Sequence, residues 1–122
     1  MDDIISKSTV YIISDSTGET AQNVVHAALG QFDSNDIQVK LLAHIESKKD
    51  ITGIISQLNK EKVFIVYTIV KPELRLFLKE ESKKHYIVSF DLLGPMIENI
   101  ERISGIKPVS YTHLTLPTNR EV

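Results

Sequence analysis

Strand-type and helix-type hydrophobic patterns alternate along this chain with little sequence between them. Strand patterns lie at 9–14, 37–45, 63–70 and 86–90, and each is followed by apolar residues at helical spacing. The run at 63–70 is rich in β-branched residues and is typical of a central strand covered on both faces. Alternating strands and helices favour parallel strands joined by right-handed crossovers. We therefore predict a three-layer α/β fold with about four parallel strands and helices on both faces.

The helical patterns predict which side chains face the sheet. Helices are expected from Thr20 to Phe32, from Ser47 to Asn59, from Pro72, and from Gly94 to Gly105. A Gly just after the last periodic residue is a common helix stop. In the first helix the residues expected to be buried are Ala21, Val24, Val25, Ala28, Leu29 and Phe32. In the last helix they are Met96, Ile97, Ile100 and Ile103.

The bulk composition excludes several functional classes. With 14 Lys+Arg against 16 Asp+Glu the formal net charge is −2, which offers no electrostatic footprint for nucleic acid or an anionic membrane. The absence of Cys rules out disulfides, a thiolate nucleophile and a Cys-ligated metal site. The acidic start lacks signal-peptide features, and no apolar run approaches the ~20 residues that span a bilayer. We therefore expect a cytoplasmic protein.

Small hydroxyl residues and one Gly gather between the first strand and the first helix. Residues 14–20 read Ser-Asp-Ser-Thr-Gly-Glu-Thr. Backbone N–H groups converge in such a turn, hydroxyls add donors, and the helix N-terminus adds a partial positive charge. The loop therefore predicts a site for an anion such as phosphate. The residues expected to form it are Ser14, Asp15, Ser16, Thr17, Gly18 and Thr20.

The same segment can instead be interpreted as a helix cap. Ser16 and Glu19 fit the S-x-x-E pattern of a capping box, in which each side chain satisfies a backbone N–H. Capping explains these two residues but explains the other polar residues of the turn less well. The loop has no Lys and does not match the P-loop pattern G-x-x-x-x-G-K-[ST]. Both interpretations stay open from the residues alone.

Further candidates follow the other strands, because the carboxyl ends of parallel strands meet at one edge where ligands bind. Asp91 follows the fourth strand, where a carboxylate can act as a base, a Mg²⁺ ligand or simply a turn residue. His44 lies near the end of the second strand. Lys71 and Arg75 follow the third strand at i and i+4, where they either face an anion or are solvated. No His pair has metal-ligand spacing, so no metal site is predicted.

Three segments, in this order, resemble one bacterial family. They are 10–21, which contains the loop at 14–20, then 67–75, which reads Tyr-Thr-Ile-Val-Lys-Pro-Glu-Leu-Arg, and then 91–95, which reads Asp-Leu-Leu-Gly-Pro. The likeness continues to 105–108 and covers about residues 8–108. The family is that of the regulatory proteins of pyruvate, phosphate dikinase and phosphoenolpyruvate synthase.

The resemblance implies a bifunctional enzyme. Members phosphorylate a Thr of their target, the dikinase or the synthase, with ADP as donor, and they remove that phosphate by phosphorolysis with inorganic phosphate. Mg²⁺ and a homo-oligomer are further expectations, whereas no catalytic residue is implied. Members are longer than this chain, and their P-loop lies in the C-terminal half. We therefore expect this chain to correspond to the N-terminal half, to be inactive alone, and to expose apolar surface.

The segment 110–122 differs from the rest of the chain. It is Thr-rich, has no clear period, and resembles the translated sequencing-adapter sequence found at the broken ends of reading frames. We predict one α/β domain over 1–109, followed by a non-native and disordered tail at 110–122.

Two other functions stay open. The turn at 17–20 matches the T-G-x-T turn that holds the FMN phosphate in flavodoxin-like electron carriers, although the loops after the third and fourth strands offer no aromatic residue to flank a flavin. The other alternative is a non-catalytic module that docks on the dikinase through its open edge. A yellow protein would support the first alternative. Binding to the dikinase that needs no ADP and gives no phosphorylation would support the second.

Overall fold

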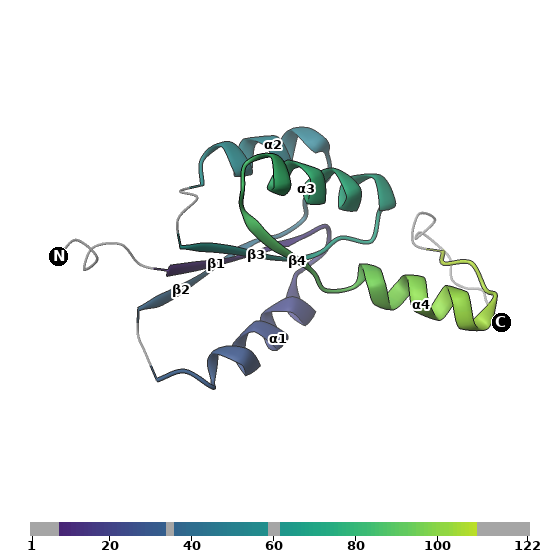
Figure 1. Cartoon of the computed structure of the whole chain (residues 1–122), viewed down its shortest axis with the longest axis horizontal. Coiled ribbons are helices and arrows are strands. Elements are labelled where there is room, and N and C mark those ends of the chain that lie inside the picture. Colours follow the sequence, from purple (N-terminus) through teal and green to yellow (C-terminus); the bar gives the residue numbers. More distant parts are fainter. Residues whose placement is uncertain (1–7, 34–35, 59–61, 110–122) are drawn as a thin grey trace.

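Four parallel strands form a single sheet in the computed structural model, which describes residues 8–33, 36–58 and 62–109 (Figure 1). The strands are β1 (Ser8–Ser14), β2 (Ile37–Leu42), β3 (Val63–Thr68) and β4 (Val88–Asp91), in the spatial order β2-β1-β3-β4. They alternate with the helices α1 (Glu19–Leu29), α2 (Lys48–Ser56), α3 (Pro72–Lys84) and α4 (Gly94–Ser104). All three strand pairings are parallel. The predicted α/β fold is confirmed.

Helices cover both faces of the sheet. α2 and α3 lie on one face and α1 on the other (Figure 1). Adjacent β1 residues belong to different hydrophobic clusters, with Ile13 packing on the α2–α3 side and Ile12 on the α1 side. This follows from the strand geometry, in which successive side chains point to opposite faces. The two clusters give the predicted three layers.

β3 is central, as its apolar run predicted. It pairs with β1 on one side and with β4 on the other. Four consecutive residues are buried, from Ile65 to Thr68, because both faces of this strand are covered. β2 and β3 each end before their apolar runs end. His44 has a positive φ of 59° and leaves the strand direction, and β4 begins only after Tyr86, which has a positive φ of 58°.

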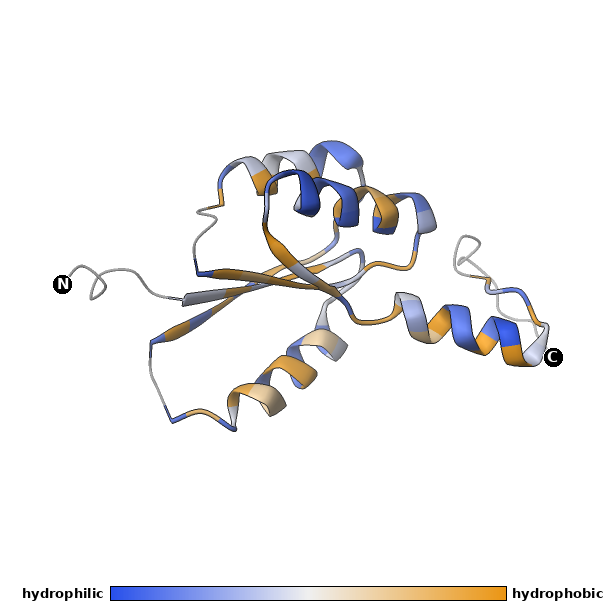
Figure 2. Ribbon diagram, viewed as in Figure 1, coloured by the Kyte–Doolittle hydropathy of each residue, from blue (hydrophilic) through white to orange (hydrophobic). Residues whose placement is uncertain are grey.

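The expectation that α4 packs its apolar stripe inward is wrong. Met96, Ile100 and Ile103 are 57%, 56% and 75% exposed. Figure 1 shows α4 extending away from the sheet, and Figure 2 shows orange apolar bands along it. Gly105, in the left-handed region with φ 73°, ends the helix as predicted. The apolar period therefore predicts the helix correctly but does not say what covers it.

The stripe predicted for α1 is only partly buried. Ala21 and Val25 are buried, whereas Val24 is 45% exposed. Phe32 is 63% exposed and lies beyond the last residue of the helix, Leu29. The tail predicted at 110–122 lies outside the described residues. None of the helices in the described ranges has the length and apolar character needed to cross a membrane.

Candidate functional site

The loops that follow the strands are tied together at the carboxyl edge of the sheet. The backbone N–H of His44 donates to the Ser16 carbonyl at 2.9 Å, and that of Ile45 donates to the Ser14 carbonyl at 2.9 Å. These bonds join the loop after β2 to the loop after β1. All the residues that we predicted as site candidates lie at this edge, because each follows a parallel strand.

Asp15 directly follows β1, at the edge between β1 and β3. This is the topological switch point, because β2 lies on one side of β1 and β3 on the other. Its Oδ2 atom accepts hydrogen bonds from the backbone N–H of Val70 at 2.9 Å and of Lys71 at 3.3 Å. Its own N–H donates to the Thr68 carbonyl at 3.4 Å. Oδ1 is buried and has no hydrogen-bond partner among the described residues. Asp15 therefore clamps the loop after β3 to the loop after β1 at the topological switch point.

The hydroxyl groups of the loop at 14–20 divide into two kinds. The Ser14 side chain is buried, and its Oγ accepts a hydrogen bond from the Ser16 N–H at 3.0 Å. Ser16, Thr17 and Thr20 are exposed. The Thr17 Oγ1 atom accepts a long hydrogen bond of 3.4 Å from the Glu19 N–H. Ser14 thus holds the shape of the loop, while the other three residues face solvent.

The capping-box interpretation of this loop is wrong. α1 begins at Glu19, and its N-cap is Gly18, which has a φ of 82° and no side chain to cap the helix. Because the cap falls two residues after Ser16, the Ser16 hydroxyl cannot close the box. A Cβ at position 18 would meet only the end of the flexible, exposed Leu41 side chain, so the turn favours Gly because of its positive φ. The N-terminus of α1 is therefore left without a side-chain cap.

Asp91 and Arg75 meet on the β4 side of this edge. The Arg75 Nε atom lies 3.7 Å from the Asp91 Oδ2 atom, with side chains only 15% and 22% exposed. A second guanidinium nitrogen of Arg75 donates to the Val70 carbonyl at 3.4 Å. Asp91 Oδ1 accepts a 2.6 Å hydrogen bond from the Gly94 N–H. Asp91 therefore serves the turn into α4, which is the simpler of its predicted roles.

Tyr67 interacts with the Asp91–Arg75 pair, and the sequence did not single it out as a site residue. It is buried, and it is paired in register with Asp91 across β3 and β4. Burial, and then the charge of Asp91, raise the pKa of Tyr67 to about 12, although Arg75 acts in the opposite direction. A Tyr within an apolar run resembles a core residue, and only the strand pairing shows that it faces a charged pair.

His44 and Lys71 flank the loop at 14–20 on opposite sides. Both are exposed. Lys71 is the N-cap residue of α3 and lies next to the backbone bonds that Asp15 accepts. Arg75, by contrast, is directed to Asp91 rather than to the open edge. Lys71 is thus an exposed cation in the loop that Asp15 holds next to residues 14–20.

The two carboxylates at this edge contact groups of the protein itself. Asp15 accepts hydrogen bonds from the amides of the β3–α3 loop, and Asp91 accepts one from Gly94 and pairs with Arg75. Across the part of the chain that the structure describes, no three His, Cys, Asp or Glu side chains gather in a way that could hold a metal ion. Mg²⁺ therefore stays an expectation of the resemblance.

Comparisons with known proteins agree on one family. The sequence model of the kinase/pyrophosphorylase family matches residues 10–121. Relatives named as pyruvate, phosphate dikinase regulatory proteins occur in Geobacillus thermodenitrificans, at 36% identity over 104 residues, and in Shouchella clausii, at 37% over 99 residues. A protein of Syntrophomonas wolfei, named as pyruvate, phosphate dikinase regulatory protein 2, is 40% identical over 99 residues.

These matches cover most of this chain but only part of each relative. They span 85% of the chain and 39% of the Geobacillus relative, and 81% of the chain and 36% of each of the other two. The matched part is the N-terminal part of the relatives. On the strength of the family match over most of its length, this chain belongs to the kinase/pyrophosphorylase family.

Proposed function

We propose that this chain works as the N-terminal part of a bifunctional ADP-dependent Ser/Thr kinase and phosphate-dependent pyrophosphorylase. Its target would be pyruvate, phosphate dikinase, which the names of the relatives favour over phosphoenolpyruvate synthase. The observation that carries the proposal is the loop at 14–20. Its exposed hydroxyls surround the uncapped N-terminus of α1 at the switch point of the sheet.

The role we assign to this edge is to bind a phosphate group. Phosphoryl transfer relies mostly on positioning and on neutralising charge. The hydroxyls of Ser16, Thr17 and Thr20 can donate to phosphate oxygens, and the first N–H groups of α1 add donors and a partial positive charge. The Lys71 ammonium can approach from the neighbouring loop. Asp15 acts here as a positioning residue, because its hydrogen bonds hold the two loops side by side.

The direct test is a titration of the ¹⁵N-labelled chain with inorganic phosphate, pyrophosphate and ADP, followed by NMR. We expect the largest shifts at the amides of residues 16–21. The variant Thr17→Val should weaken the binding severalfold, while Thr52→Val, an exposed Thr on α2, should not change it. Equal shifts with chloride at the same ionic strength, or shifts unrelated to this loop, would count against the proposal.

The regulatory role is tested with the dikinase itself. If the chain retains the docking function, it should capture the dikinase in a pull-down. A requirement for ADP, together with phosphorylation of a Thr, would support the enzyme interpretation for this chain alone. Capture without ADP and without phosphorylation would support the non-catalytic docking module that the sequence also allowed.

The electron-carrier alternative shares one feature with the structure. The strand order β2-β1-β3-β4 matches the first four strands of the flavodoxin-like order 2-1-3-4-5. The family match, however, favours the kinase/pyrophosphorylase interpretation. Purification of a colourless chain, which then takes up no FMN during dialysis, would remove this alternative.

A further inference from the structure

The peptide group that joins Val70 to Lys71 is held from both sides by charged side chains. Its N–H, which belongs to Lys71, donates to the Asp15 Oδ2 atom at 3.3 Å. Its carbonyl, which belongs to Val70, accepts from a guanidinium nitrogen of Arg75 at 3.4 Å. The N–H of Val70 itself also donates to Asp15, at 2.9 Å. Because both polar groups of this peptide are bonded, its orientation beside the loop at 14–20 is set by two side chains rather than one.

Asp91 in turn determines where the Arg75 guanidinium points. The Arg75 Nε atom lies 3.7 Å from the Asp91 Oδ2 atom, and the two side chains are only 15% and 22% exposed. Their attraction is therefore less screened by salt than that of a surface pair. The planar guanidinium can face Asp91 with one nitrogen and the Val70 carbonyl with another, whereas a Lys ammonium is a single point charge.

Gly94 leaves the space that the Asp91 carboxylate occupies. The Gly94 N–H donates to the Asp91 Oδ1 atom at 2.6 Å, and a Cβ at position 94 would overlap this carboxylate. Gly94 is absent from the described glycines with a positive φ, so space rather than backbone conformation favours Gly here. The two oxygens of one carboxylate thus bind different partners, one at the start of α4 and one on α3.

We propose that Arg75 is a positioning residue of the phosphate site, held in place by Asp91. It acts through the Val70 carbonyl to fix the backbone of Lys71 beside the loop at 14–20, and it does not contact the phosphate. This inference rests on the proposed function, in which the Lys71 ammonium approaches the phosphate. It explains why Arg75, at the edge where an anion is expected, is directed to Asp91. Phosphate affinity should then depend on two side chains that do not touch the ligand.

The ligand-free chain gives the first test. Asp91→Asn keeps an oxygen for the Gly94 N–H but removes the charge that holds Arg75. Arg75→Lys keeps the positive charge but loses the planar group that serves two partners. We expect both variants to shift the NMR resonances of the Val70 and Lys71 amides and to speed their hydrogen exchange. Unchanged amides in both variants would overturn the positioning role.

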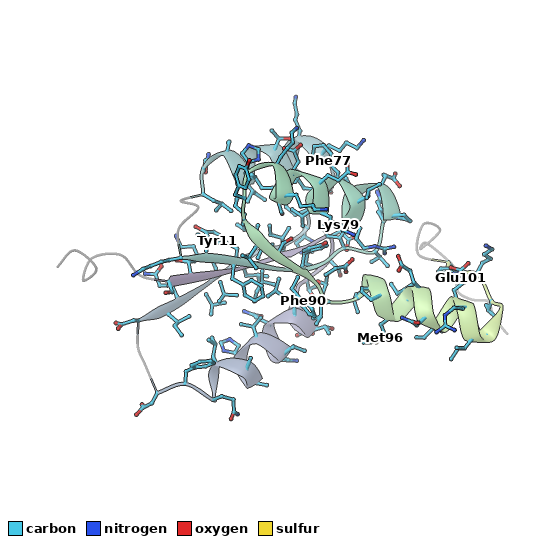
Figure 3. All side chains as sticks on the ribbon, viewed as in Figure 1. Tyr11, Phe77, Lys79, Phe90, Met96 and Glu101 are labelled. Carbon is cyan, nitrogen blue, oxygen red and sulfur yellow. The ribbon has the colours of Figure 1, made fainter. Side chains whose placement is uncertain are left out.

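Glu101→Gln is the matched control, because it removes the same charge from another ion pair. The Glu101 Oε2 atom lies 3.0 Å from the Lys107 Nζ atom. Figure 3 labels Glu101 toward the outer end of α4, away from the strands. This variant should leave the amides of Val70 and Lys71 unchanged. Equal shifts in the control would mean that a change of net charge alone causes them, and this result also overturns the inference.

A titration with inorganic phosphate gives the second test. Asp91→Asn should weaken binding severalfold, and the loss should nearly vanish when Lys71→Gln is already present, because Arg75 acts through Lys71. Fully additive losses would show that the pair does not act through Lys71. Tighter binding by Asp91→Asn would show that the released Arg75 contacts the phosphate itself. Either result overturns the positioning role, whereas a residue that only stabilises the fold would leave the affinity unchanged.

The two proposals fail in different ways. If the unmodified chain shows no phosphate binding at residues 14–20, the proposed function fails. If it binds phosphate and the Asp91→Asn and Arg75→Lys variants bind it equally well, the proposed function stands and the role of Arg75 is overturned. Circular dichroism establishes that each variant is folded under the conditions of the titration.

Discussion

Asp15 shows how one side chain organises the candidate site. Its Oδ2 atom accepts from two consecutive amides of the β3–α3 loop, while its backbone continues into the loop at 14–20. A carboxylate that accepts backbone N–H groups makes charge-assisted bonds, which are stronger than neutral ones. The same residue type read from the sequence suggested a metal or phosphate ligand. In the structure its first role is to hold two loops together.

Removal of this clamp should destabilise the fold. We expect Asp15→Ala to lower the free energy of unfolding by about 2 kcal/mol, because the two amides lose a charged acceptor. Asp15→Asn keeps one acceptor oxygen and should cost less. Urea denaturation followed by circular dichroism measures both changes. Asp33→Ala, at an exposed position, should stay within about 0.5 kcal/mol of the unmodified chain.

Two glycines should respond to the same substitution with opposite signs. Gly18→Ala places a Cβ on a residue in the left-handed region, so we expect it to destabilise the chain by about 1–2 kcal/mol. Gly53→Ala lies inside α2 with nothing within 4 Å of the new Cβ. It should stabilise the chain by about 0.5–1 kcal/mol, since Ala loses less backbone entropy in a helix. Thermal and urea unfolding of the pair give both signs.

Tyr67 should make stability depend on alkaline pH. Because its pKa is raised to about 12 in the folded chain, against 10.0 ordinarily, the folded state favours the neutral phenol. Its contribution is complete below pH 10 and is lost as the pH rises through about 12. The free energy of unfolding should therefore fall across this window. Tyr67→Phe should flatten the slope, whereas Tyr86→Phe, at a position that is 86% exposed, should not.

At the scale of elements, the N-termini of α1 and α2 differ although both follow an S-x-x-acid pattern. At α2 the box forms: the Ser47 hydroxyl accepts from the Asp50 N–H at 3.2 Å, and the Asp50 carboxylate accepts from the Ser47 N–H at 3.2 Å. Backbone hydrogen bonds from Glu46 and Ser47 lower the pKa of Asp50. At α1 the left-handed Gly18 displaces the cap. The N-terminus of α2 has a side-chain cap, and the N-terminus of α1 has none.

Substitution of the two serines should separate these roles. Ser47→Ala removes a formed cap and should cost about 1 kcal/mol of stability. Ser16→Ala removes a hydroxyl that caps nothing and should change stability by less than about 0.5 kcal/mol. The same Ser16→Ala variant should weaken phosphate binding in the NMR titration if our proposal is correct. Equal losses of stability at both positions would contradict the structure of the α1 N-terminus.

At the scale of the whole molecule, order should decline from the central strands to α4. β1 and β3 carry fully buried residues of both clusters, such as Ile12 and Ile65. α4 has no comparable packing and leaves its stripe exposed. The molecule thus combines a complete core on the α2–α3 face with an apolar groove of about 790 Å³ beside α1, and this agrees with the exposed apolar surface expected from the sequence.

Hydrogen exchange should show this gradient. At a concentration where the chain is monomeric, we expect the amides of α4 to exchange almost as fast as those of an unstructured peptide. The amides of β1 and β3 should exchange only through global unfolding. Strong protection of α4 in the monomer would mean that it packs on its own chain.

The local patterns determined the elements and the side of the sheet on which the site lies. Alternating strand and helix periods reflect which side chains each element buries, so they predicted the α/β class, the central β3 and the candidate edge. The end of α4 at Gly105 was also predictable from local sequence, because a Gly with a positive φ commonly ends a helix. Where the sequence failed on local structure, as at Ser16, a competing turn at Gly18 placed the cap two residues later.

Only the tertiary structure decided which of these features meet. The bonds from Asp15 to the β3–α3 loop join residues 55 and 56 positions apart, and the Tyr67–Asp91 register depends on strand order. No short window of the sequence predicts such pairings, because they depend on the order and register of strands that are far apart in the chain. For the same reason the apolar stripe at 96–103 predicted a helix but not which surface would bury it. Apolar periodicity is a property of one element, whereas burial requires a second element to pack against it.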